Sequence, residues 1–159
     1  MKSKVSTFFL IFLFITCFVY CSEENNGDYH VIPNIRVSVD INLSYADYQD
    51  LNFPGQPVYY NQAGNNGDVP GYNGNGLVII MMNSDEYECF DATCTHCLEG
   101  IVEVEKGNVT GICDHCATEF LLNFYGQPSN IPEEDNDEKI YPLKRYAAIK
   151  QGNYLRIRN

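Results

Sequence analysis

The sequence predicts an all-β fold. Twelve of its 159 residues are tyrosine and nine are phenylalanine, types that are enriched in strands. No segment has the spacing of a convincing amphipathic helix, and no repeat typical of solenoids is present. A strand with one buried face is indicated where apolar and polar residues alternate, with the apolar ones at Ile35, Val37, Val39, Ile41 and Leu43.

The amino terminus has the pattern of a secretion signal. Lys2 and Lys4 precede an uncharged run at residues 5–20 that is rich in Phe, Leu, Ile and Val. This run is short for a membrane-spanning helix, which needs about 20 apolar residues. We therefore expect residues 1–20 to be a signal peptide and residues 21–31 a polar tether.

Two cysteines at the end of this signal suggest a lipid anchor. Cys21 is followed by Ser22 and two glutamates, as at the start of a mature bacterial lipoprotein. Cys17 has the more usual upstream neighbours for such a site, whereas Tyr20 is an unusual residue before a modified cysteine. We expect Cys21 to carry the lipid, with Cys17 or cleavage without a lipid as alternatives. The protein would then be periplasmic, or a lipoprotein of the outer membrane or cell surface.

The remaining chain is strongly acidic. The whole sequence has 10 basic and 21 acidic residues. Residues 1–20 contain two of the lysines and no acid, so the mature net charge would be −13. Such a surface repels nucleic acid and anionic lipids, so we expect no nucleic-acid partner and membrane contact only through the lipid anchor. Residues 32–159 are enough for one modest domain.

Further short strands follow along the chain. A helical turn or a partner strand is expected at residues 45–52, and a long polar loop at residues 61–76. Residues 77–82 are continuously apolar, which suits a strand buried on both faces. The other expected strands lie at residues 58–60, 87–91, 101–104, 109–112, 120–124, 140–149 and 154–157, and residues 130–138 form a polar loop. Cys89, within one of these strands, is interpreted as a small buried hydrophobe.

Two short motifs carry the chemistry: box 1, Cys94-Thr95-His96-Cys97, and box 2, Cys113-Asp114-His115-Cys116. Thiolates and imidazoles at such spacing are typical ligands of zinc or iron–sulfur centres. Each box follows a predicted strand, and one hairpin connects them. Because a hairpin returns its ends to one edge of a sheet, the boxes are predicted to share one metal centre.

The two boxes resemble those of a Rieske domain. That family has Cys-x-His, a spacer of some fifteen to seventeen residues, then Cys-x-x-His and a downstream aromatic residue. Here sixteen residues separate His96 from Cys113, and Phe120 has the aromatic position. The closing segment at residues 141–155 is similar to the last hairpin of that family, and the opening at residues 32–35 is similar to that of bacterial Rieske-like lipoproteins. The resemblance implies a Rieske-like β-sandwich with a two-loop cluster-binding subdomain over residues 32–159.

The resemblance also implies a ligand set. Carried over position by position, the ligands are Cys94, His96, Cys113 and Cys116, where Cys116 replaces the second family histidine. The optional disulfide of the family is not expected, because its two positions hold Glu99 and His115. A third thiolate adds negative charge, so the reduction potential of a [2Fe–2S] centre should be lower than that of a two-histidine centre.

Two other arrangements are compatible with the residues. Cys97 could replace His96, which gives four thiolates in the pattern of a structural zinc site. Alternatively, Cys94 could form a disulfide with Cys97 or Cys113, since an exported protein meets oxidising conditions.

The resulting hypothesis is an exported, lipid-anchored Rieske-like iron–sulfur protein that transfers electrons through a [2Fe–2S] centre. It would act with a redox partner protein, as a carrier or a redox component rather than as a stand-alone enzyme. The alternative is a non-redox binding module whose loops are fixed by structural zinc or by disulfides.

Overall fold

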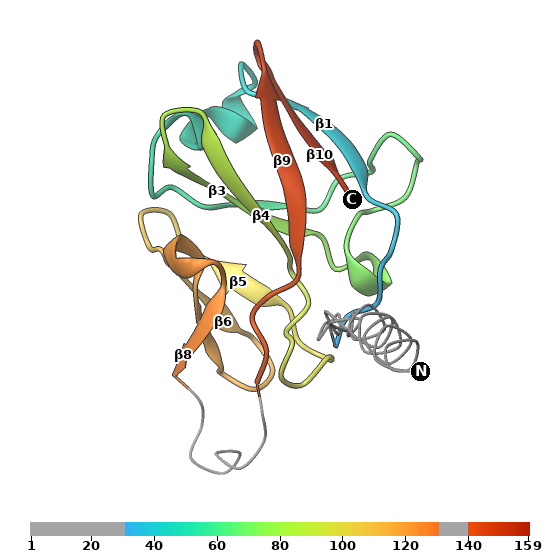
Figure 1. Ribbon diagram of the computed structural model, residues 1–159, viewed down its shortest axis with the longest axis vertical. Helices are drawn as coiled ribbons and strands as arrows, with labels where there is room; N and C mark the ends of the chain where they lie inside the picture. Colours follow the sequence, from blue (N-terminus) through green and yellow to red (C-terminus); the bar gives the residue numbers. More distant parts are fainter. Residues whose placement is uncertain (1–30, 131–139) are drawn as a thin grey trace, which may run out of the picture.

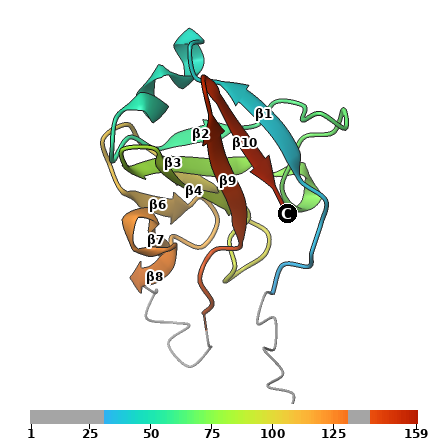
Figure 2. The same ribbon diagram turned by 45° about the horizontal axis from the view of Figure 1, so that its top comes forward.

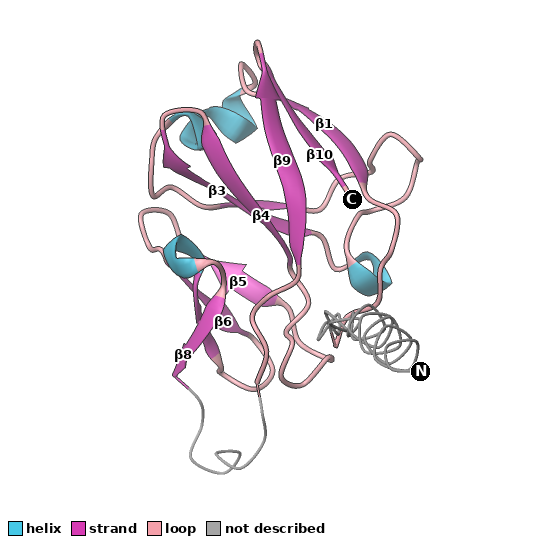
Figure 3. Ribbon diagram, in the orientation of Figure 1, coloured by secondary structure: helices cyan, strands magenta, loops and turns pink. Residues whose placement is uncertain are grey.

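Two antiparallel sheets form the molecule (Figures 1 and 3). The computed structural model describes residues 31–130 and 140–159; the expected signal peptide, residues 21–30 of the tether and residues 131–138 of the polar loop lie outside this part. The strands are β1 (Ser38–Asn42), β2 (Val58–Tyr60), β3 (Leu77–Asn83), β4 (Glu86–Asp91), β5 (Val102–Val104), β6 (Thr110–Cys113), β7 (Glu119–Leu121), β8 (Gln127–Asn130), β9 (Arg145–Gln151) and β10 (Tyr154–Arg158). Short 3₁₀ helices cover Ala46–Asn52, Tyr72–Gly74 and Leu122–Phe124. This architecture confirms the predicted all-β sandwich.

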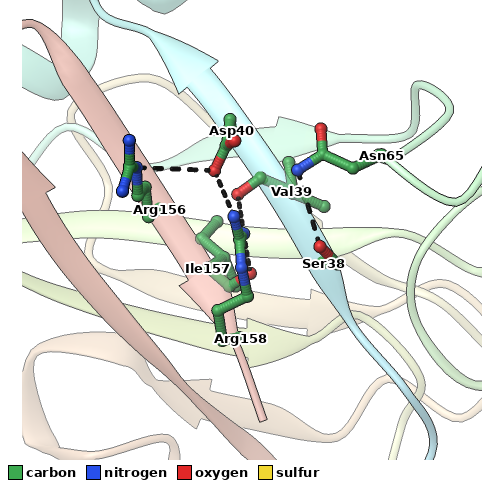
Figure 4. A network of polar contacts seen from close by, with 7 residues as sticks. All are labelled: Ser38, Val39, Asp40, Asn65, Arg156, Ile157 and Arg158. Atoms are coloured by element: carbon green, nitrogen blue, oxygen red, sulfur yellow. Dashed lines mark hydrogen bonds and ion pairs between the residues drawn. The ribbon is translucent and has the colours of Figure 1, made fainter.

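The large sheet has the order β1-β10-β9-β4-β3-β2. Figure 2 shows β9 and β10 crossing over the strands β2 and β3, with β1 beside β10. Charged side chains fasten the pair formed by β1 and β10 (Figure 4): Arg158 donates to Asp40 Oδ1 at 2.5 Å and to the carbonyl oxygen of Val39 at 2.6 Å. The long polar loop at residues 61–76 covers the free edge of β1, because the N–H of Asn65 donates to the carbonyl oxygen of Ser38 at 2.8 Å.

Strand β3 separates two hydrophobic cores. Successive side chains of a strand point to opposite faces, and here the odd-numbered apolar residues of β3 pack into one core while Val78 and Ile80 pack into the other. The first core lies inside the large sheet and includes Cys89, which is fully buried as predicted. The second lies between the two sheets and includes Cys94 and Cys113. The prediction that residues 77–82 form a strand buried on both faces is therefore confirmed. The second core packs directly against the candidate site, because it contains two of the box cysteines.

The small sheet has the order β5-β6-β7-β8 and carries box 2. Box 1 follows β4 of the large sheet, and box 2 begins at Cys113, the last residue of β6. An isolated bridge between Thr93 and Ile101 joins the chain on either side of box 1. Each box is thus a loop at a strand end.

Some element boundaries differ from the sequence predictions. The strand expected at residues 120–124 ends at Leu121 and continues as a 3₁₀ helix, and β8 was not expected. The strand expected at residues 140–149 begins only at Arg145: Pro142 has no N–H to donate to a ladder, and the N–H of Leu143 donates instead to the carbonyl oxygen of Gly126 at 2.9 Å. In the described ranges, no helix has the length and apolar character that a membrane crossing requires.

Candidate metal centre

A buried carboxylate fixes the chain just before box 1. Asp91 is completely buried at the end of β4. Its Oδ2 accepts hydrogen bonds from the Tyr146 hydroxyl and from the N–H of Tyr72, both at 2.7 Å, and its Oδ1 accepts one from the N–H of Thr93 at 2.9 Å. Burial and the neighbouring Asp91 charge raise the pKa of Tyr146 well above its usual range. These bonds join β4, β9 and the long polar loop at residues 61–76 directly beside the site.

The two boxes have the same backbone turn. In box 1 the N–H of Leu98 donates to the carbonyl oxygen of Cys94 at 3.1 Å, and in box 2 the N–H of Ala117 donates to that of Cys113 at 3.0 Å. Leu98 and Ala117 have φ values of 60° and 56°, a left-handed conformation that is uncommon for residues other than glycine. Such strain persists only where the surroundings enforce it. The turn brings both cysteines of a box to the same side of the loop.

Hydrogen bonds also join the boxes to each other. The N–H of Ile101 donates to Asp114 Oδ1 at 2.7 Å, and the N–H of Asp114 donates to the carbonyl oxygen of Ile101 at 3.0 Å. The loop of box 1 is itself closed by a hydrogen bond from the N–H of Cys94 to the carbonyl oxygen of Gly100 at 3.0 Å. A β-carbon at Gly100 would lie 2.3 Å from Cys113 Sγ, so only glycine fits where box 1 approaches box 2.

Four sulfur atoms converge at this junction. The Sγ atoms of Cys94, Cys97, Cys113 and Cys116 all lie within 4.8 Å of one another. The short separations that join the boxes are 3.7 Å for Cys94–Cys116 and 3.6 Å for Cys97–Cys113. None of the cysteines in the described residues forms a disulfide. The shared centre predicted from the hairpin is therefore confirmed as a group of four thiols.

The histidines of the boxes lie outside this group. His96 Nδ1 is 2.7 Å from the hydroxyl of Thr118, which is itself 3.2 Å from Cys116 Sγ. His115 Nε2 pairs with Glu99 at 3.3 Å on the exposed side of the loops. Of the four ligands carried over from the family, the structure brings Cys94, Cys113 and Cys116 together with Cys97, the alternative fourth ligand. The CxxC spacing was the sequence signal for Cys97.

The environment of the sulfurs divides them into two kinds. Cys94 and Cys113 are buried and Cys97 and Cys116 half-buried. Burial raises the pKa of the Cys94 thiol, and it raises the pKa of Cys113 to about 11 despite hydrogen bonds from the N–H groups of Cys116 and His115. Burial also opposes ionisation of Cys116, but the hydroxyl and N–H of Thr118 outweigh it and lower the pKa of this thiol to about 6. One thiolate therefore forms readily, and a bound metal would stabilise the others in the ionised form.

No protein-family model and no curated protein sequence matches the chain. Solved structures are similar in fold. Naphthalene 1,2-dioxygenase with indole bound has a TM-score of 0.53 and 18% identity over 80% of this chain, which corresponds to 27% of the dioxygenase. The quaternary ammonium Rieske monooxygenase CntA, in complex with an inhibitor, has a TM-score of 0.51 and 15% identity over 80% of this chain and 32% of its own.

A third similar structure is the plasma membrane Rieske protein PetC3 from Synechocystis PCC 6803, with a TM-score of 0.49 and 18% identity over 79% of this chain and 100% of its own. The chain spans about a third or less of the length of the two oxygenases. With two antiparallel sheets and two loops that meet at one group of four cysteines, the chain has the fold of Rieske domains.

Proposed function

We propose that the protein is an electron carrier that binds iron through Cys94, Cys97, Cys113 and Cys116. The observation that carries this proposal is the convergence of four unpaired sulfurs on two loops that the fold holds side by side. Thiolates are the ligands of protein-bound iron–sulfur centres. Iron bound by them would supply a one-electron couple.

The donor set departs from that of a Rieske centre, which uses two cysteines and two histidines. At the position of the second family histidine, Cys116 supplies a thiolate, and His96 contacts Thr118 rather than the sulfur group. The residues therefore fit a thiolate-bound metal and do not fit a two-histidine cluster.

The position of the sulfurs supports electron exchange with a partner protein. Cys97 and Cys116 are half-buried, and the chain beside them is exposed at Glu99 and His115. A partner that docks over this edge could approach the centre closely. Cys94 and Cys113 are instead embedded in the core between the sheets, which fixes the centre relative to the fold. We propose a redox partner protein that binds at the exposed edge.

The test is a redox titration of the purified protein monitored by its visible spectrum. An iron–thiolate centre should give charge-transfer absorption that bleaches on reduction and returns on reoxidation. Cys116→Ala should abolish this absorption, whereas Cys89→Ala, which changes a buried cysteine in the other core, should keep it. A protein that contains iron but shows no reversible change would refute the proposal.

A second candidate function is a non-redox binding module stabilised by zinc. The observation that favours it is that all four donors come from the protein and surround one point, since structural zinc sites are closed in this way. A colourless protein that contains zinc and loses thermal stability in a chelator would establish this candidate.

We also propose that the protein is exported and lipid-anchored through Cys21, with Cys17 as the alternative, in the periplasm, the outer membrane or at the cell surface. The support is the sequence of residues 1–24, which combines a basic start, an apolar run and an acidic segment after Cys21. Incorporation of a labelled fatty acid that Cys21→Ala abolishes and Cys17→Ala does not would confirm Cys21. The opposite pattern would assign the lipid to Cys17.

A further inference from the structure

The spacing of the four sulfurs indicates how many metal ions they enclose. A tetrahedral ion with metal–sulfur bonds of about 2.3 Å places its ligand sulfurs about 3.8 Å apart. The Cys94–Cys116 and Cys97–Cys113 sulfur separations of 3.7 and 3.6 Å match this value. The sulfurs of the remaining pairs lie within 4.8 Å of each other. A two-iron cluster divides its four ligands between two metals with bridging sulfide between them, so ligands on different irons must lie farther apart. The observed sulfurs leave no such space.

The hydrogen bonds around the sulfurs point to the same conclusion. The Cys94 sulfur accepts from the N–H groups of His96 and Cys97, and the Cys97 sulfur accepts from the N–H of Gly100 at 3.3 Å. Box 2 has the same hydrogen bonds to its first sulfur and a different donor to its second. There the Cys113 sulfur accepts from the N–H groups of His115 and Cys116, and the Cys116 sulfur accepts from that of Thr118.

Every one of the four sulfurs thus accepts at least one backbone N–H, in two turns of the same shape. Hydrogen bonds to an ionised acceptor are stronger than neutral ones. These hydrogen bonds stabilise four thiolate charges around a single divalent ion. The ion and its four thiolates together carry a net charge of −2, which the N–H dipoles partly offset. Because the donors are backbone groups of the turns, this support depends on the fold of the boxes.

His96 has a supporting role in this arrangement. A hydroxyl has one hydrogen to donate. If Thr118 donates it to the Cys116 thiolate, its oxygen can accept the Nδ1–H of His96. His96 then acts as a positioning residue that orients the Thr118 hydroxyl, and Cys97 completes the ligand set.

We infer that this Rieske-type fold holds a single metal ion in a site of four thiolates, in place of a two-iron cluster. This inference concerns the centre on which the proposed electron transfer rests, but it does not depend on which metal the site binds.

The test measures iron, zinc and acid-labile sulfide per chain in the full-length protein. One iron and no sulfide would support both the inference and electron transfer. One zinc and no sulfide would support the inference and overturn electron transfer. Two irons with two sulfides would overturn the inference and leave electron transfer in place. No bound metal would overturn both.

Variants test the ligand set independently of the native metal. Cobalt(II) added to the metal-free protein should give one equivalent of a tetrahedral, thiolate-rich spectrum. At saturating cobalt, Cys97→Ala should lose the part of the sulfur-to-cobalt absorption that one of the four thiolates contributes, while His96→Ala should retain all of it. The control Cys89→Ala removes a cysteine of equal burial to Cys94 but outside the site, and it should behave as the unchanged protein. Loss of the spectrum in His96→Ala with retention in Cys97→Ala would overturn the inference.

Discussion

Gly100→Ala should impair metal binding through one steric contact. The new β-carbon would lie 2.3 Å from Cys113 Sγ, 2.7 Å from His115 Cβ and 2.8 Å from Asp114 Oδ1. Non-bonded heavy atoms need about 3.5 Å, so the two boxes must separate by roughly 1 Å. Overpacking of this kind costs about 1–3 kcal/mol. If the strain is relieved when the sulfurs move apart, metal affinity should fall about tenfold to hundredfold.

Competition with a chromophoric chelator measures this loss of affinity. Gly111→Ala is the matched control, because its β-carbon would lie 2.5 Å from Val102 Cγ1 in the same small sheet, and its nearest neighbours do not include a sulfur. The control should lower the free energy of unfolding while its metal affinity stays close to that of the unchanged protein. If Gly100→Ala binds metal as tightly as Gly111→Ala, the close packing of the boxes does not set the site geometry, and the reasoning fails.

Three further predictions test the surroundings of the site. Thr118→Val removes the hydroxyl between Cys116 and His96 and should weaken metal binding about tenfold to hundredfold in the same competition assay. The control Thr110→Val changes the residue at the end of β6 that is remote from box 2, and it should leave metal affinity unchanged. Tyr146→Phe deprives buried Asp91 of a donor and should cost about 1–3 kcal/mol at neutral pH. The pKa of Tyr146 is raised above the value of about 10 in an unfolded chain, so its contribution to folding stability is complete below pH 10 and is lost as the pH rises further. In urea unfolding, the difference in free energy of unfolding between the unchanged protein and Tyr146→Phe should therefore narrow above pH 10 by up to about 1.4 kcal/mol per pH unit. Removal of the metal by a chelator should increase hydrogen exchange in the small sheet before the large one, and equal protection with and without metal would contradict a stabilising role of the centre.

Much of the fold follows from local patterns. Residues 77–82 indicated a strand buried on both faces, and the structure shows why: alternate side chains serve different cores. Strand β8, Gln127–Asn130, could not be found in this way. Its residues are polar and partly exposed, and it pairs because β7 offers a free edge. Long-range pairing, which a local pattern does not contain, defines such a strand.

The site was predictable in its location but not in the fourth side chain that joins Cys94, Cys113 and Cys116 there. The hairpin placed both boxes at one edge, and CxxC spacing proposed Cys97, while the family register proposed His96. In the structure the sulfur of Cys97 lies with the other three, and the left-handed conformation of Leu98 turns the chain directly after it. Leucine has no preference for that conformation, so the residue at position 98 gave no indication of the turn. Gly100 was visible in the sequence, but its closeness to Cys113 arises only when the two loops meet.

The contacts that shape the boxes are largely separate from the four sulfur atoms. Asp91 fixes the chain before box 1, Asp114 joins the boxes through Ile101, and the carbonyl oxygen of Gly100 receives the N–H of Cys94. None of these groups belongs to the four sulfurs. Because the fold orients two short loops through such bonds, the side chains that face their junction can change while the junction is preserved. A Rieske-type fold can therefore present four thiolates where the family pattern has two histidines, and the chemistry of the centre has to be determined from its donor atoms rather than from the fold.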